Sequence, residues 1–176
     1  DFFDEGEIRL LTELSDNISF ALESMAHQER LDYMSYYDAL TGLPNARLFL
    51  DRAAQQMRRR SGEQRMVTLM LFEVERFRGI NETLGREGGD ALLRQVASRL
   101  ESSFGGKDFL ARVGPDSFGV VVRGVRDAAE AANIFERQIS RCLASPFVIN
   151  REELRIAVRG GITLFPADGT DAETLF

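Results

Sequence analysis

The chain has 176 residues, of which 44% are hydrophobic and 28% charged, and its formal net charge is -6 at pH 7. This balance is typical of a globular domain, and the negative charge argues against a nucleic-acid binder that uses a broad basic surface. No apolar run approaches the roughly 20 residues of a membrane-spanning helix, and the acidic start is unlike a signal peptide. We therefore expect a cytoplasmic protein, in keeping with a single cysteine that excludes an intrachain disulfide.

Residues 5 to 36 are predicted to form one long helix. Leu11, Ile18 and Met25 recur every seven residues, and Leu14 and Ala21 fill the second seam of the same repeat. Such a stripe suits either a helix that packs on its own domain or a signalling helix that pairs with a second copy of the chain. Because few residues precede the helix to form a core, we favour self-association.

The rest of the chain alternates helical and strand patterns. The expected elements after a turn at 38–45 are a helix up to about residue 60, a strand at 66–74, a polar turn, a helix at 90–104, a hairpin of 109–112 and 118–122, a helix at 127–143, and strands at 147–149 and 154–165. This order predicts an α+β fold with helices on one or both faces of a mostly antiparallel sheet.

A final helix is expected to begin at the C-terminal end. Thr170 and Glu173 have the spacing of a capping box. We expect the chain to be a fragment that stops inside this helix.

Acidic residues stand where the strand at 66–74 ends and where the hairpin turns. If the hairpin pairs beside that strand, Glu73 and Asp116 come together, and adjacent carboxylates are costly to hold without a cation. Oxygen ligands of this kind suit Mg²⁺. The spacing suggests a metal-nucleotide site, although most acids at strand ends are simply solvated.

A series of motifs resembles those of GGDEF domains, in the same order. They read D-A-L-T-G-L-P-N at 38–45, E-V-E-R-F-R-G-I-N-E at 73–82, G-D-A-L-L at 89–93, R-V-G-P-D-S-F at 112–118 and G-I-T-L-F-P-A-D-G at 161–169. The resemblance implies a fold like the palm of class III nucleotidyl cyclases. It divides the chain into a signalling or linker helix at 1–36 and a GGDEF-type domain at 37–176. Residues 2–22 also resemble the closing helix of a GAF-type sensory domain.

The resemblance implies a metal site. Active GGDEF domains meet face to face in pairs, each holding one GTP, and join the two molecules into cyclic di-GMP. By resemblance, Glu73 and Asp116 would hold Mg²⁺ with the carbonyl of Val74 whenever nucleotide is bound.

The resemblance also implies nucleotide contacts. Asn81 and Asp90 would hydrogen-bond guanine, although they could instead cap a turn and a helix. Backbone amides around Arg76 and Phe77 would meet phosphate, and Gly114 would also contact the nucleotide.

The segment at 112–118, called the signature loop below, departs from the family pattern. Pro115 replaces the second glycine, and proline has no N–H and a fixed φ. Ser117 replaces an acid, and Glu73 is one methylene longer than the usual aspartate, which shifts a metal ligand by about 1 Å. The family's inhibitory product site, R-x-x-D, keeps Asp108 but lacks its arginine.

These departures predict a degenerate, regulatory GGDEF domain that can bind GTP but is impaired or inactive as a diguanylate cyclase. The alternatives are an active cyclase with a variant signature and a ligand-free dimerisation module. We expect partners to be GTP, a second copy bound through the N-terminal helix, and a C-terminal EAL phosphodiesterase domain in the full-length protein.

Three further residues have simpler expected roles. Asp38 is expected to cap a turn rather than to act in catalysis. Arg112 is expected to pair with an acid on the neighbouring strand, and Arg159 to be a surface residue of its strand.

Overall fold

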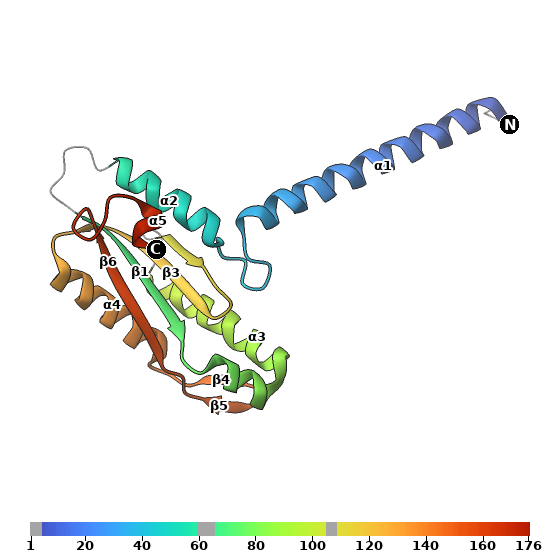
Figure 1. The fold of residues 1–176 in the computed structure, drawn as a ribbon. Coiled ribbons are helices and arrows are strands. Elements are labelled where there is room, and N and C mark those ends of the chain that lie inside the picture. The colour runs from blue at the N-terminus through green and yellow to red at the C-terminus, as the bar shows by residue number, and fades with distance from the viewer. Residues whose placement is uncertain (1–4, 60–65, 105–108) are drawn as a thin grey trace. The chain divides into compact units, whose positions relative to one another are not determined.

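The computed structural model describes residues 5–59, 66–104 and 109–176 (Figure 1). It divides into two units, Asp1–Ser35 and Tyr36–Phe176. Helix α1 (Glu5–Tyr36) accounts for the described part of the first unit and confirms the long helix predicted there. Within the described residues, no helix combines the length and apolar character needed to cross a membrane.

Helix α1 presents large apolar side chains to solvent. More than half of the surface of each of the following is exposed: Leu14, Ile18, Phe20, Leu22 and Met25. The described residues of this unit therefore do not bury these side chains.

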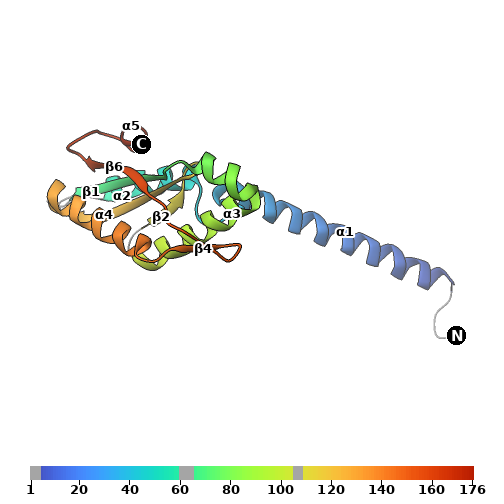
Figure 2. The ribbon, with the colours of Figure 1, turned by 90° about the horizontal axis from the view of Figure 1, so that it is seen from below.

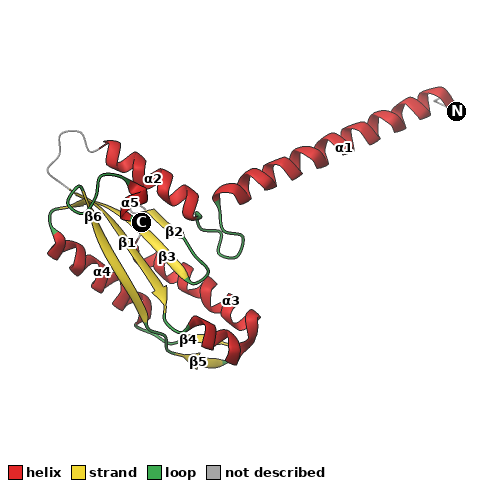
Figure 3. Ribbon diagram, in the orientation of Figure 1, coloured by secondary structure: helices red, strands yellow, loops and turns green. Residues whose placement is uncertain are grey.

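The second unit is built on a four-stranded sheet in the order β2-β3-β1-β6, in which each neighbouring pair is antiparallel. Its strands are β1 (Met66–Val74), β2 (Phe109–Arg112), β3 (Ser117–Val125) and β6 (Val158–Phe165). A separate hairpin pairs β4 (Phe147–Ile149) with β5 (Glu152–Leu154). The mixed α+β class with an antiparallel sheet flanked by helices is confirmed (Figure 3).

Helices cover both faces of the sheet. The helices are α2 (Ala46–Arg59), α3 (Phe77–Phe104), α4 (Ala128–Leu143) and α5 (Ala172–Leu175). Helices α3 and α4 lie on one face, and α2 and α5 on the other (Figures 1 and 2). Because side chains alternate along a strand, Phe72 and Val74 of β1 join the α3/α4 core, whereas Val67 and Leu69 join the α2/α5 core. The strand predicted at 66–74 is thus confirmed, and it is buried on both faces.

The prediction of a polar turn before residue 90 was wrong. Helix α3 already begins at Phe77, and it breaks at Gly85, whose φ of 72° and ψ of 169° are not helical. Gly88 and Gly89 instead allow close packing: a Cβ on Gly88 would lie 2.6 Å from the Cβ of Leu84. A dense set of glycines therefore resembled a turn in the sequence but produces a broken helix.

The strand predicted at 154–165 is two strands. Residues 155–157 separate β5, which pairs with β4, from β6, which joins the main sheet. Leu154, Ile156 and the residues of β6 read as one run in the sequence, and only the pairing partners distinguish the two strands.

Two helix starts also differ from prediction. Asp171, rather than Thr170, caps α5 by accepting a hydrogen bond of 2.8 Å from the N–H of Thr174. The helix predicted from residue 127 begins as α4 at Ala128, because Asp127 is its N-cap.

Candidate functional site

Strand pairing brings the signature loop beside the end of β1. In the β1–β3 register Glu73 lies opposite Ser117, and the N–H of Val74 donates to the carbonyl of Asp116 over 3.0 Å. The hairpin therefore pairs beside the strand, which is the condition that the sequence argument for a shared site required. On the other side of β1, strand β6 places Arg159 opposite Glu73.

Arg159 forms a forked ion pair with Glu73. Its Nη2 lies 2.9 Å from Oε1 and 3.1 Å from Oε2 of Glu73, and its Nε lies 3.3 Å from Oε2. The side chains of Arg159 and Glu73 are 69% and 38% exposed. The hydrogen bond to Glu73 raises the pKa of Arg159, and the charges of Glu75 and Asp116 add to the effect. Arg159 is on the surface, as expected, but its role as a partner of Glu73 was missed.

This arrangement does not fit a divalent cation shared by the predicted ligands. In the part of the chain that the structure describes, no group of three or more Asp, Glu, His or Cys side chains is placed to hold a metal ion. Both oxygens of Glu73 accept from Arg159, and the hydroxyl of Ser117 donates to Oδ1 of Asp116 over 3.3 Å. Glu73 and Asp116 lie at the same end of the sheet, but the charge of Glu73 is already balanced by Arg159.

A groove of 440 Å³ opens beside the Glu73–Arg159 pair. Its wall includes the backbone of Gly114, Gly160 and Gly161, and Phe176 lies at its side. Small residues leave main-chain groups accessible there. The groove can therefore admit a polar group close to the signature loop.

The signature loop is fixed by its own backbone and by Arg112. The N–H groups of Val113 and Gly114 both donate to the carbonyl of Ser117, over 2.9 and 3.2 Å. Nη2 of Arg112 donates to the carbonyl of Pro115 over 2.5 Å. Pro115 itself is exposed. The turn geometry therefore does not depend on a core contact of the proline ring.

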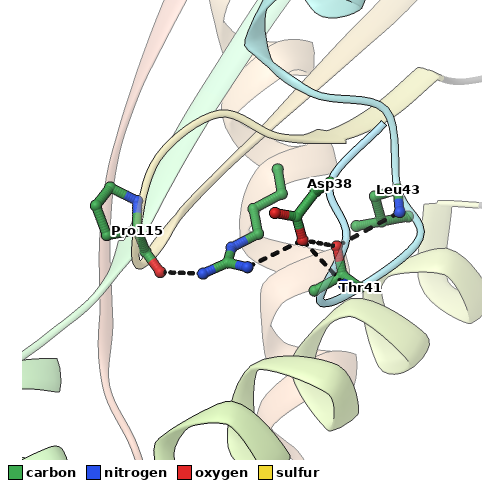
Figure 4. Close-up of polar contacts among 5 residues, drawn as sticks. Asp38, Thr41, Leu43 and Pro115 are labelled. Atoms are coloured by element: carbon green, nitrogen blue, oxygen red, sulfur yellow. Dashed lines mark hydrogen bonds and ion pairs between the residues drawn. The ribbon is translucent and has the colours of Figure 1, made fainter. Parts of the chain in front are cut away.

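Arg112 ties this loop to the turn at 38–45 (Figure 4). Its Nη1 lies 2.9 Å from Oδ1 of Asp38, and the same oxygen accepts from the N–H and the hydroxyl of Thr41, over 2.9 and 2.6 Å. Asp38 thus caps the turn, as predicted. The acid that pairs with Arg112 comes from this turn and not from a neighbouring strand, so that expectation was wrong.

The surroundings of Asp38 favour its charged form. Partial burial raises the pKa of Asp38, but hydrogen bonds from Thr41 and Arg112 outweigh burial and leave the pKa below its ordinary value. The carboxylate is therefore an ionised anchor of the turn.

Both predicted guanine-binding residues line a second hollow, of 460 Å³. Asn81 precedes the break at Gly85 and Asp90 follows it, and Phe77 and Pro115 line the same hollow. Both residues lie within α3, so neither of the capping roles considered for them is observed. A Cβ on Gly89 would lie 1.9 Å from Oδ1 of Asn81, so this glycine leaves the room that Asn81 occupies.

The predicted phosphate contacts lie at the start of α3. Arg76 has a φ of 55°, and α3 begins at the next residue, Phe77. The first N–H groups of a helix have no intrahelical acceptor and attract anions. The backbone here has the chemistry that the phosphate role requires. The segment compared with the inhibitory product site, 105–108, lies outside the described residues.

The comparisons agree on one family. Residues 35–176 match the family model described as diguanylate cyclase, GGDEF domain. The chain is 32% identical over 157 residues to the bifunctional diguanylate cyclase/cyclic di-GMP phosphodiesterase MucR of Pseudomonas aeruginosa, covering 89% of this chain and 23% of MucR. It is 34% identical over 154 residues to an uncharacterized signaling protein of Caulobacter vibrioides, covering 87% of this chain and 19% of that protein. The chain thus spans about a fifth of the length of these relatives.

Solved structures show the same likeness. The crystal structure of a sensory box/GGDEF family protein from Caulobacter crescentus aligns with a TM-score of 0.74 at 34% identity, covering 80% of this chain and 90% of that one. The GGDEF domain of TpbB from Pseudomonas aeruginosa aligns with a TM-score of 0.74 at 26% identity, covering 80% and 81%.

Proposed function

Because this chain belongs to the GGDEF family of diguanylate cyclase domains, we propose that residues 37–176 form a catalytically impaired, regulatory GGDEF domain of cyclic di-GMP signalling. The observation that carries this proposal is the state of the sheet end. There Glu73 is engaged by Arg159, Ser117 stands where a carboxylate is usual, and Pro115 occupies the tip of the loop. Each feature removes charge neutralisation or positioning from phosphoryl chemistry, which depends chiefly on those two effects.

GTP is the ligand that we propose for this domain. The hollow beside α3 joins an amide, Asn81, to a carboxylate, Asp90, and together they can complement the donor and acceptor edge of guanine. The start of α3 at Arg76 and Phe77 would meet the phosphates, and Gly114 of the signature loop would also contact the nucleotide. Binding contacts can thus persist where catalytic ones are lost.

We propose that Mg²⁺ binds here only together with the nucleotide. The oxygens of Glu73 and Asp116 and the carbonyl of Val74 have the chemistry of Mg²⁺ ligands. The ion would have to compete with Arg159 for Glu73. We therefore assign no chemical step to it.

We propose that α1 pairs with α1 of a second copy. Leu14, Ile18 and Met25 lie on the predicted heptad seam and are each more than half exposed within their unit. Pairing of two seams would remove this apolar surface from water. It would also couple two domains through their helices.

We also propose that the full-length protein carries a phosphodiesterase (EAL) domain. The relative MucR is described as a bifunctional diguanylate cyclase/cyclic di-GMP phosphodiesterase, and NbdA of Pseudomonas aeruginosa as a cyclic di-GMP phosphodiesterase. The chain covers 23% and 21% of these proteins. A regulatory domain joined to a phosphodiesterase gives GTP binding a function without turnover.

The test is a GTP titration of the full-length protein, with and without Mg²⁺, followed by an assay for cyclic di-GMP. We expect saturable GTP binding and no product. Asp90→Asn should weaken GTP binding by about tenfold or more, because a hydrogen bond to a charged group contributes about 1.5–3 kcal/mol and about 1.4 kcal/mol corresponds to tenfold in affinity. Glu87→Gln, an exposed carboxylate on the same helix, is the matched control. Product formation would establish the active cyclase instead, and absence of binding the ligand-free module.

A further inference from the structure

We propose that Arg159 is a built-in counter-ion that takes the place of a divalent cation at the end of the sheet, and that it thereby keeps such cations from binding Glu73. The inference rests on the proposed function only in treating Glu73 and Asp116 as parts of the same site. It concerns cation binding by the free domain and requires neither GTP nor turnover.

The position of Arg159 is fixed by strand pairing. Strand β6 pairs residue by residue with β1 from Val67↔Phe165 to Val74↔Val158, which sets Arg159 directly opposite Glu73. The next residue, Gly160, lies so close to β1 that a Cβ on it would approach the carbonyl oxygen of Leu71 to 2.5 Å. The backbone that carries the guanidinium therefore has little freedom to move away.

The charges at this end of the sheet call for a cation. Glu73 and Asp116 are brought together by the β1–β3 pairing, and the negative charges of Glu75 and Asp116 both act on Arg159 in addition to that of Glu73. Gathered carboxylates repel one another unless a positive charge lies among them. In this chain a side chain supplies that charge.

The guanidinium of Arg159 and a metal ion cannot both bind the carboxylate oxygens of Glu73 at the same time. The planar fork of arginine matches a carboxylate with parallel hydrogen bonds, and its charge is permanent. Both Glu73 oxygens accept from Arg159 at 3.3 Å or less. Mg²⁺ needs an oxygen at about 2.0–2.1 Å in a nearly octahedral shell, so it would first have to displace the fork.

The expected change in Mn²⁺ affinity follows from the exposure of the Glu73–Arg159 pair. With side chains 69% and 38% exposed, the pair belongs to the class of surface ion pairs, whose upper range corresponds to roughly fivefold in affinity. Removal of the nearby positive charge adds to this. We expect the Mn²⁺ affinity of an Arg159→Ser variant to exceed that of the unaltered protein by about fivefold or more.

The test uses Mn²⁺, which also prefers oxygen ligands and whose free concentration can be read by electron paramagnetic resonance. Full-length protein, unaltered or carrying Arg159→Ser, is titrated without nucleotide. Arg155→Ser, at another exposed arginine just before β6, is the matched control and should leave the Mn²⁺ affinity unchanged. The double variant Arg159→Ser/Glu73→Gln should not show the increased Mn²⁺ affinity of the Arg159→Ser variant.

Two results would overturn the inference. One is equal Mn²⁺ affinity of the unaltered protein and the Arg159→Ser variant, and the other is a gain that survives in the double variant. Arg159→Lys gives a second check: it retains the positive charge without the fork, so its Mn²⁺ affinity should lie between those of the unaltered protein and the Arg159→Ser variant. Because GTP binding is measured separately, a failure here is distinguishable from a failure of the proposed regulatory function.

Discussion

Among single residues, Arg112 has the most demanding surroundings. Its side chain is 11% exposed, its guanidinium pairs with Asp38 and with the carbonyl of Pro115, and its Nε is buried without a hydrogen-bond acceptor among the described residues. Removing a partner from a largely buried charge leaves that charge uncompensated, which costs 3–5 kcal/mol when burial is complete.

Asp38→Asn should therefore lower the free energy of unfolding by about 2 kcal/mol, since the pair is only partly buried. Urea denaturation followed by circular dichroism measures the change. The matched control is Glu82→Gln, which breaks the exposed pair with Arg78, 93% and 68% exposed, and should cost no more than about 0.5 kcal/mol. Equal losses in the two variants would contradict the importance given to the Asp38–Arg112 pair.

The same pair predicts a pH dependence. Because the folded protein lowers the pKa of Asp38 from its ordinary value of 3.8, the ionised carboxylate stabilises the fold above that pH. The contribution disappears as the pH falls through the lower, folded-state pKa. The stability difference between the unaltered protein and Asp38→Asn should be constant from about pH 5 to 7 and shrink below about pH 4. A difference that persists undiminished at pH 3 would contradict this.

Residue identities were more predictable than residue partners. The sequence placed Glu73 and Asp116 at the ends of neighbouring strands, and this pairing is present. It did not reveal that Arg159 faces Glu73, because the register of β6 depends on where β5 ends and β6 begins. Because Arg159 lies 86 residues from Glu73 in the sequence, no local sequence pattern links the two residues.

At the scale of elements, the break in α3 matters most to the candidate site. Gly85 has a φ and ψ of 72° and 169°, a region that essentially only glycine occupies. The break separates the helical segment of Asn81 from that of Asp90, and both residues line the same hollow. The sequence contains the glycine but does not show which of the several glycines nearby is the one that interrupts the helix.

Gly85→Ala should cost about 1–3 kcal/mol of unfolding free energy, because alanine is strained in this conformation. Gly79→Ala is the matched control on the same helix: a Cβ there meets nothing within 4 Å, and the substitution should be neutral or stabilise by up to about 1 kcal/mol. Urea denaturation of both variants measures the difference. A stabilising Gly85→Ala would contradict the observed break.

At the scale of the whole molecule, the most consequential prediction concerns the number of copies. Ile18→Ser on the seam of α1 should shift the protein toward the monomer in sedimentation equilibrium, because it places a hydroxyl at a predicted helix-helix contact. Phe20→Ser is the matched control: this side chain is 72% exposed but lies off the seam. Equal dissociation by both variants, or by neither, would contradict the proposed pairing.

The general architecture was predictable because β1 and α2 carry clear patterns. The run at 66–74 could only be a strand buried on both faces, and Phe49, Ala53 and Met57 define one face of α2. The sheet order and the separate β4–β5 hairpin were not predictable, since they depend on contacts between distant segments.

The signature loop protrudes from this architecture, and this has an evolutionary consequence. Pro115 is exposed, and the hydrogen bonds that shape the tip come mainly from main-chain groups, whereas Phe118, which follows the loop's serine, is fully buried. Substitutions at the tip should therefore cost less folding stability than substitutions of Phe118. A lineage can lose enzymatic competence there while the scaffold persists and stays available for recruitment to a different cellular task.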